Sequence, residues 1–356
     1  MIDRATTSQR LPRDPVIDMA KGCAILGVLV IHSDAMRGSF LFWHVVNQAV
    51  PVFLVMYGVN ATYWWERRTP SVDWREWYAR WIDRVMVPVW AMLPLWWAMA
   101  LYFRPWGVRL TWWLPFVQAA GFLMHVGTGW FVTLAIQLAL FQPALEALAR
   151  RIGRPALLAI GLVVTAVISG VGAVVIGPAE LFYYAMFSPR VMGVVAFGMI
   201  LAPYVRGLDW RAGCSAAAVL AVAIFAREAA LAQFTDIGLV VAEEATWVGA
   251  LALTVVLLAV LRPVAQVAVV APALEWLGRS SYGIYIGQLI VHNLFVYGYG
   301  LAYFYERIAG WSYAGVLLAG GIGFTWLGGA LRRVAAGLRQ RLVPPHRSRS
   351  YASPPP

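Results

Sequence analysis

Apolar runs of about twenty residues recur along the chain, separated by short segments that carry Arg, Pro or Gly. A helix of about twenty apolar residues matches the hydrocarbon thickness of a bilayer. We therefore expect an all-α, polytopic membrane protein with about ten transmembrane helices. The pattern places them at about 16–36, 41–65, 85–103, 130–148, 155–177, 189–205, 212–230, 245–261, 281–300 and 311–331.

One segment, 104–129, fits this pattern less well, because it is aromatic and is broken by Pro105, Pro115 and several glycines. It could be a further span or a loop that dips into the outer interface. If it does not cross, 21 of the 28 Lys and Arg residues fall on the cytoplasmic side. Positive charge concentrates in cytoplasmic loops, so this distribution favours ten spans with both termini in the cytoplasm.

The same pattern predicts the domain organisation. We expect a cytoplasmic tail over 1–15, one membrane domain over 16–331, and a basic, partly disordered cytoplasmic tail over 332–356. The apolar stretch 264–278 is short and contains a proline, so we expect a half-buried element on the cytoplasmic side there.

Composition supports a membrane protein and excludes a nucleic-acid partner. Hydrophobic residues make up 61% of the chain and charged residues only 13%, whereas a soluble domain carries about 25% charged residues. The net charge of +11 is explained by the cytoplasmic loops and by attraction to anionic membrane lipids. Cys23 and Cys214 both fall in predicted helices, so we expect packing residues and no disulfide.

The first predicted helix carries the most informative polar residues, Asp18, Lys21 and His32, and Lys21 is the only lysine of the chain. A charge near the bilayer centre costs about 2.5–3.5 kcal/mol, so such residues usually face a protein interior or a wet cavity. Helical geometry puts Lys21 and His32 on one face, about 16 Å apart, with Ile25 and Leu29 between them. The polar stripe indicates a functional site; the alternative is a set of packing groups satisfied by neighbours.

Histidine suits a general base because its ordinary pKa, about 6.5, lies near working pH. We interpret His32 as that base, close to a hydroxyl acceptor. Lys21 then pairs with Asp18 or holds an anionic donor. His44 and Asp34 lie near His32 in the predicted topology, so they are candidates for the acceptor site, although an interface position also explains His44.

A second group of candidates follows the second predicted helix, where five arginines alternate with aromatic residues. Arginine binds phosphate oxygens in a bidentate way, so this segment could bind the phosphates of acyl-CoA. The alternative is an amphipathic segment on lipid headgroups. We favour the headgroup alternative for Arg67, Arg68 and Arg75. For Arg80 and Arg84 we leave both interpretations open. His32, His44 and His292 lack a recognised ligand spacing, so no metal is expected.

Residues 18–32, DMAKGCAILGVLVIH, resemble the first-helix signature of the acyltransferase-3 family of integral membrane acyltransferases, in particular a branch similar to fucose and exopolysaccharide O-acetyltransferases. Later stretches extend the resemblance in the same order along the chain. They are PVFLVMYGVNATYWW (51–65), YARWIDRVMVPVW (78–90) with Arg80 and Arg84, GWFVTLAIQL (129–138) with Trp130, and LGRSSYGIYIGQLIV (277–291) with Tyr282.

The resemblance implies an O-acyltransferase of the bacterial inner or plasma membrane. Such enzymes move an acyl group, usually acetyl, from cytoplasmic acyl-CoA to a hydroxyl of a glycan, a lipid-linked glycan or another acceptor at the outer face. The resemblance also gives His32 the catalytic role and Lys21 the accompanying basic role. It places Arg80 and Arg84 near the donor. Whether transfer is direct or passes through an acyl-histidine stays open.

The family pattern often carries a histidine where this chain has Gln288. Glutamine does not shuttle a proton, but it can hydrogen-bond a sugar or a carbonyl. His292 lies four residues on, hence on the same helical face. We expect Gln288 to bind substrate rather than His292 to replace the missing histidine. Gly283 and Gly287 equally indicate that this helix simply packs closely against another.

A transporter or flippase for a glycan or lipid is the alternative function, with Asp18, Lys21 and His32 forming a proton or substrate pathway. Transporters commonly show repeated halves. The chain shows no internal repeat, which favours the enzyme.

Overall fold

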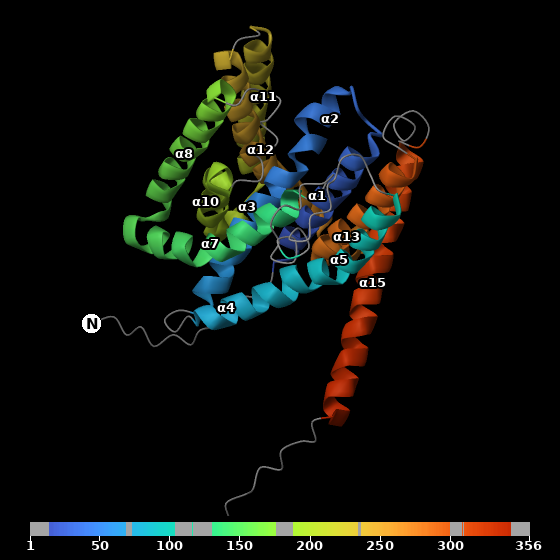
Figure 1. Cartoon of the computed structure of the whole chain (residues 1–356). Helices are drawn as coiled ribbons and strands as arrows, with labels where there is room; N and C mark the ends of the chain where they lie inside the picture. Colours follow the sequence, from blue (N-terminus) through green and yellow to red (C-terminus); the bar gives the residue numbers. More distant parts are fainter. Residues whose placement is uncertain are drawn as a thin grey trace, which may run out of the picture.

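The protein is an all-α bundle in the computed structural model, which describes residues 14–68, 73–103, 116, 130–175, 188–233, 236–299, 308 and 310–342 (Figure 1). The longer helices are α1 (Pro15–Ser33), α3 (Ala49–Glu66), α5 (Val87–Phe103), α7 (Trp130–Ile152), α8 (Arg154–Val175), α10 (Met192–Leu201), α11 (Trp210–Leu231), α12 (Asp236–Val264), α13 (Val270–Tyr299) and α15 (Trp311–Leu342). Two shorter helices are α2 (Phe40–His44) and α4 (Trp74–Trp81).

Each of the ten predicted spans has a helical counterpart. Within the described ranges, seven helical stretches are long and apolar enough to cross a membrane, which confirms an all-α polytopic membrane protein. The other three counterparts are α5, α8 and α13. The segment 104–129 that decides the topology lies outside the described residues except for Phe116, so ten spans with cytoplasmic termini stays a prediction.

The second predicted span is interrupted near its start by a 3₁₀ turn, Val46–Gln48, between α2 and α3. The cause is Pro51, which has no N–H to donate to the carbonyl of Asn47. The sequence predicted one span over 41–65 here. Asn47 and Gln48 of this turn both line a cavity described below, and Gln48 is buried.

Two further boundaries differ from the expected ones. The prediction of a separate half-buried element at 264–278 is wrong, because α13 begins at Val270 and continues to Tyr299. Pro272 does not prevent this, since it stands in the first turn, where its missing N–H has no helical partner to lose. At the other end α15 continues to Leu342, because residues such as Leu and Arg favour helix.

Helix α1 packs against α3, α12, α13 and α15 at the centre of the bundle. Its contact with α13 is a backbone contact: a Cβ on Gly278 would lie 1.7 Å from the carbonyl oxygen of Asp18, and a Cβ on Gly22 would lie 2.3 Å from that of Leu274. The packing role foreseen for Gly283 and Gly287 is also confirmed, since both approach α15.

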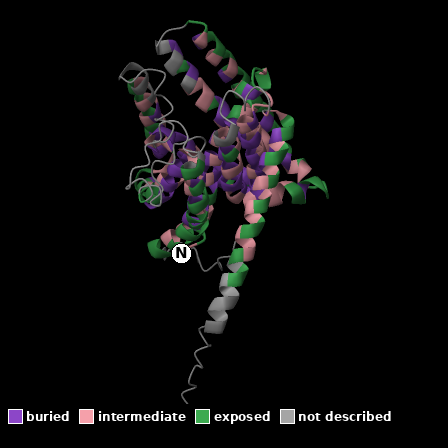
Figure 2. Ribbon diagram, turned by 45° about the vertical axis from the view of Figure 1, so that its right-hand side comes forward, coloured by how far each residue is buried: buried purple, intermediate pink, exposed green. Residues whose placement is uncertain are grey.

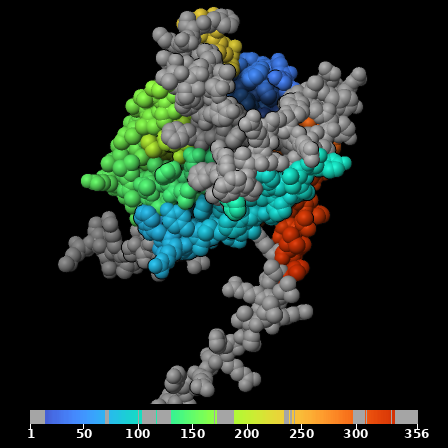
Figure 3. Space-filling view, viewed as in Figure 1, coloured from blue at the N-terminus to red at the C-terminus, as the bar shows by residue number. Residues whose placement is uncertain are grey.

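Buried residues concentrate in the middle of the bundle, and the outer helices are largely exposed (Figure 2). Only 11% of the apolar window is buried in α11 and likewise in α15, so their outer faces are available to lipid. Helices α4 and α5 run as one rod along the edge of the bundle below α7, and α15 projects beyond them on that side (Figures 1 and 3).

Candidate active site

Two cavities lie along α1. The first, here called the basic cavity, has a volume of about 320 Å³ and is lined by Lys21, Arg80 and Arg84. The second, the histidine cavity, has a volume of about 510 Å³ and is lined by His32. The polar stripe of α1 therefore serves two spaces rather than one. Four residues line both cavities and form their common wall; they are Val28, Val50, Phe131 and Tyr285.

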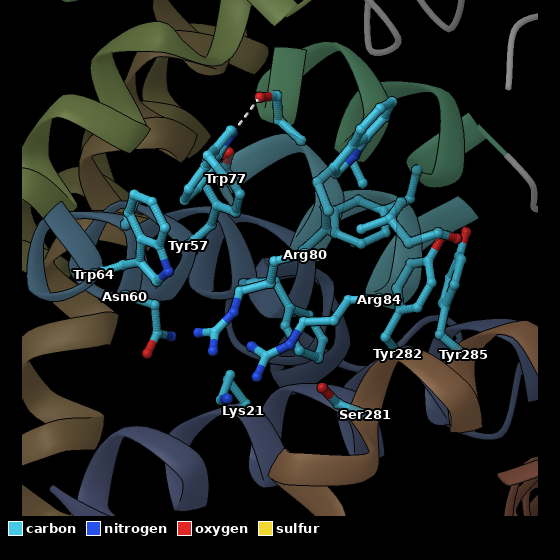
Figure 4. A pocket seen from close by; sticks show the side chains of 18 of the residues that line it. Lys21, Tyr57, Asn60, Trp64, Trp77, Arg80, Arg84, Ser281, Tyr282 and Tyr285 are labelled. Carbon is cyan, nitrogen blue, oxygen red and sulfur yellow. Dashed lines mark hydrogen bonds between the residues drawn. The ribbon is translucent and has the colours of Figure 1, made fainter. Parts of the chain in front are cut away.

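The cations of the basic cavity come from two separate helical segments. Figure 4 shows the guanidinium groups of Arg80 and Arg84 side by side, directed towards Lys21. Lys21 Nζ lies 2.6 Å from Asp18 Oδ1, and the Asp18 side chain is only 3% exposed. Asp18 thus compensates Lys21, as a buried charge requires, and Arg80 and Arg84 add two further cationic groups to the cavity lining.

A widened helical turn places Arg84 beside Arg80. Residues Ile82–Met86 form a π-helical turn between α4 and α5. Pro88 follows it and cannot donate to the carbonyl of Arg84, so the regular hydrogen-bond ladder is interrupted there. Such turns frequently occur at functional sites.

Helix α4 is held over the basic cavity by polar contacts. Arg68 binds Glu76 through Nη2 (2.7 Å) and Nε (3.1 Å), and its guanidinium lies 4.4 Å from the Trp64 ring centroid. This hydrogen-bonded arginine lowers the pKa of the Glu76 carboxyl. Trp77 Nε1 donates to the carbonyl of Ala139 at 2.9 Å. Arg68 therefore positions α4 and does not simply contact headgroups.

Three buried donors line the basic cavity. The Tyr57 hydroxyl, Trp64 Nε1 and Trp81 Nε1 have no hydrogen-bond partner within the described part of the chain. Buried donors are normally paired, and these three, which are unpaired among the described residues, lie beneath the cavity lining rather than on its surface. Tyr282 also lines this cavity, and its hydroxyl donates to the carbonyl of Val85 at 3.2 Å.

His32 is oriented by Gln288. His32 Nδ1 lies 2.8 Å from Gln288 Oε1. With Oε1 as the amide atom that faces Nδ1, the amide accepts, so Nδ1 carries the proton and the lone pair is on Nε2. This is the tautomer that a general base needs. Gln288 is fully buried and does not line the histidine cavity, so it acts on the imidazole rather than on a substrate in that cavity.

His292 lies beside the same imidazole. The His32 and His292 ring centroids are 5.6 Å apart, which confirms that Gln288 and His292 share a helical face. His292 Nδ1 lies 3.3 Å from the hydroxyl of Tyr313 on α15. Three helices, α1, α13 and α15, thus contribute to one polar cluster.

The histidine cavity also carries groups suited to a sugar. Trp43, Trp130 and Trp247 line it, and indole faces provide large amphipathic contact surfaces. Gln48 is 4% exposed, and its Oε1 has no partner among the residues that the structure describes; the same holds for Trp247 Nε1. Two residues of the cavity lining therefore carry a polar atom that is buried beneath the cavity surface and is unpaired within the described ranges.

The remaining candidates lie apart from both cavities. Asp34 caps α1 in the left-handed conformation with φ 58° and pairs with Arg37 at 3.3 Å. His44 is buried, with Nε2 3.3 Å from Glu228 Oε1. Neither residue lines either cavity. The Trp-rich segment 104–129 falls outside the described residues except for Phe116.

The fold and the site define a polytopic membrane protein with a tautomer-fixed imidazole next to a basic cavity. A family model described as "Acyltransferase domain" matches residues 14–330, and the chain belongs to this acyltransferase-3 family, as its motifs predicted. It is a membrane acyltransferase that transfers groups other than aminoacyl groups. No curated protein and no solved structure matches the chain. The family favours the enzyme over the transporter or flippase.

Several site residues carry no distinctive signal in the sequence. Tyr57 and Trp64 stand within an apolar helix, and nothing there indicates unpaired buried donors. Tyr313 lies twenty-one positions after His292 and has no motif of its own. Their roles arise from contacts between helices, so only the assembled bundle identifies them.

Proposed function

We propose that the enzyme transfers an acyl group, with acetyl the simplest case, from acyl-CoA in the basic cavity to a hydroxyl of a glycan in the histidine cavity. The observation that carries this proposal is the hydrogen bond between His32 Nδ1 and Gln288 Oε1, which leaves Nε2 as the basic nitrogen beside a cavity that shares a wall with the basic cavity. The arginine distribution and the family resemblance support a bacterial inner or plasma membrane.

The basic cavity suits the donor in charge and in hydrogen bonding. Acyl-CoA carries phosphates, which arginine binds through its planar fork, and amide and thioester carbonyls, which accept hydrogen bonds. Arg80 and Arg84 supply the first kind of contact. We propose that the donors of Tyr57, Trp64 and Trp81, which are buried beneath the lining and unpaired among the described residues, supply the second once acyl-CoA is bound. This cavity lies on the α4 side of the bundle, the side predicted to be cytoplasmic.

The transfer step follows from the tautomer of His32. Nε2 accepts the proton of the acceptor hydroxyl as its oxygen attacks the thioester carbonyl carbon. A carbon–oxygen bond forms, the carbon–sulfur bond breaks, and the CoA thiolate leaves with the proton that the imidazolium returns. The products are an acyl ester and CoA.

In this reaction the acyl group has to cross the common wall of the two cavities. Val28, Val50, Phe131 and Tyr285 separate the two cavities, so the acyl thioester has to pass between their side chains to reach His32. The Phe131 and Tyr285 rings lie edge to face with centroids 5.4 Å apart. Ring rotation at this contact is the smallest movement that would open the passage.

The test of the acyl transfer is His32→Ala in proteoliposomes with labelled acetyl-CoA. General-base catalysis contributes about 10²–10⁴ in rate, so transfer should fall by at least 100-fold, with unchanged binding of acetyl-CoA. Retained transfer in this variant would show that His32 is not the base.

Donor binding is tested separately. Arg80→Gln should raise KM for acetyl-CoA by about 10-fold, the value of one charge-assisted hydrogen bond. It should leave KM unchanged for the truncated donor S-acetyl-N-acetylcysteamine, which has no phosphate. Arg75→Gln is the matched control, since Arg75 lies on the same helix but does not line the cavity. Equal effects on both donors would argue against a phosphate contact.

A further inference from the structure

Two arginines line the histidine cavity, and the transfer step does not use them. Arg190, from the short helix Ser188–Val191, and Arg227, from α11, both line it, and no Asp or Glu does so among the described residues. Arg190 is 5% exposed, and the Arg227 side chain is 20% exposed. Buried arginines in a membrane protein are costly and usually mark a functional site.

The acidic neighbours of these arginines lie outside the cavity lining. Arg227 Nη1 is 2.5 Å from Glu228 Oε1, and Glu228 also contacts His44. Glu244 interacts electrostatically with Arg190. Each acid stabilises its arginine from outside the cavity. Since a guanidinium has five N–H donors, such an arginine can still donate to a ligand within the cavity.

Sugar-binding groups lie in the same cavity. Trp43, Trp130 and Trp247 provide faces for a sugar ring, and the Gln48 side chain also lines the cavity. A neutral glycan would use these groups alone and would make no charge-assisted contact with Arg190 or Arg227. An anionic group on the glycan would in addition accept charge-assisted hydrogen bonds from the guanidinium N–H groups of both arginines, and the bidentate geometry of arginine suits a carboxylate or a phosphate.

We infer that the histidine cavity binds an anionic glycan, with Arg190 and Arg227 holding its acidic group while His32 receives the proton of a neighbouring hydroxyl. This inference rests on the proposed acyl transfer and adds the substrate class. The anionic group is a uronate carboxylate or the diphosphate of a lipid-linked glycan; both present the same oxyanion chemistry to arginine.

The experiment compares three acceptors in proteoliposomes with labelled acetyl-CoA. They are methyl glucuronide, its neutral counterpart methyl glucoside, and polyprenyl-diphosphate-linked glucose. At least one anionic acceptor should exceed the glucoside in kcat/KM by 10-fold or more, and the preferred one identifies the source of the charge. Equal kcat/KM for all three, with transfer still dependent on His32, would overturn the inference and leave the acyl transfer standing.

Variants then locate the anion subsite. Arg227→Gln should raise KM for the preferred anionic acceptor by about 10- to 100-fold, while KM for the glucoside stays unchanged. Arg190→Lys, which keeps the charge at the more buried position, should raise the same KM by a smaller factor. Arg37→Gln, which changes an exposed arginine outside both cavities, should change neither. An equal loss with both acceptors would show that Arg227 is structural and would overturn the inference.

Discussion

Replacing Gln288 by leucine tests how the imidazole of His32 is controlled. The change keeps the volume of the side chain nearly constant but removes the acceptor that lies 2.8 Å from Nδ1. The proton on Nδ1 then loses its partner in the interior, and the imidazole is free to adopt its other tautomer. In that tautomer Nε2 carries the proton and is no longer a base.

The magnitude follows from the burial of this contact. Leaving a buried donor unpaired costs about 1–3 kcal/mol, and 1.36 kcal/mol corresponds to a tenfold change in rate. We therefore expect kcat to fall by about 5- to 150-fold. KM for acetyl-CoA should not change, because Gln288 does not line the basic cavity. A split between kcat and KM separates this positioning role from a general loss of structure.

The assay is single-turnover and steady-state acetyl transfer in proteoliposomes, with Gln142→Leu as the matched control. Gln142 is fully buried on α7, and neither polar atom of its side chain has a partner within the described residues. Its replacement should therefore leave kcat unchanged and the melting temperature equal or higher. Gln288→His, which restores an acceptor nitrogen, should recover part of the rate. A kcat for Gln288→Leu within twofold of the native value would refute the reasoning.

Two further predictions concern stability. Gly278→Ala should abolish folding or lower the free energy of unfolding by at least about 3 kcal/mol, because the new Cβ would lie 1.7 Å from the carbonyl oxygen of Asp18. The control is Gly328→Ala, at an open helical position, which should instead raise the melting temperature in detergent. Glu76→Gln should lower the melting temperature near neutral pH. Because Arg68 lowers the pKa of this carboxyl, its contribution is complete above the ordinary glutamate pKa of about 4.3. It is lost as the pH falls through the lower folded value, so the difference between native protein and variant should vanish in acid; a constant difference would contradict the assignment.

Much of the fold was predictable because bilayer burial imposes a length and a composition on each helix. The ten predicted spans all correspond to helices. The boundaries that failed involve proline in context: Pro51 interrupts the second span, whereas Pro272 starts a helix. Both residues are prolines, so only their position relative to the start of a helix decides whether they interrupt it or begin it.

The sequence predicted which chemical groups form the candidate site, but not that these groups are divided between two cavities. An intramembrane lysine and histidine on one helical face mark the site by their cost alone. Ile25 and Leu29, between the lysine and the histidine, belong to the packed core. Val28 forms part of the wall between the two cavities, and this division was not predicted.

The sequence by itself determined the class of protein and the membrane helices, and it singled out Lys21, His32, Arg80 and Arg84 as candidates, because these follow from local composition, spacing and motifs. Tertiary structure alone decided that Gln288 sets the tautomer of His32. It also decided that the polar stripe serves two cavities. Contacts between helices depend on distances across the bundle, which no periodicity along the chain specifies.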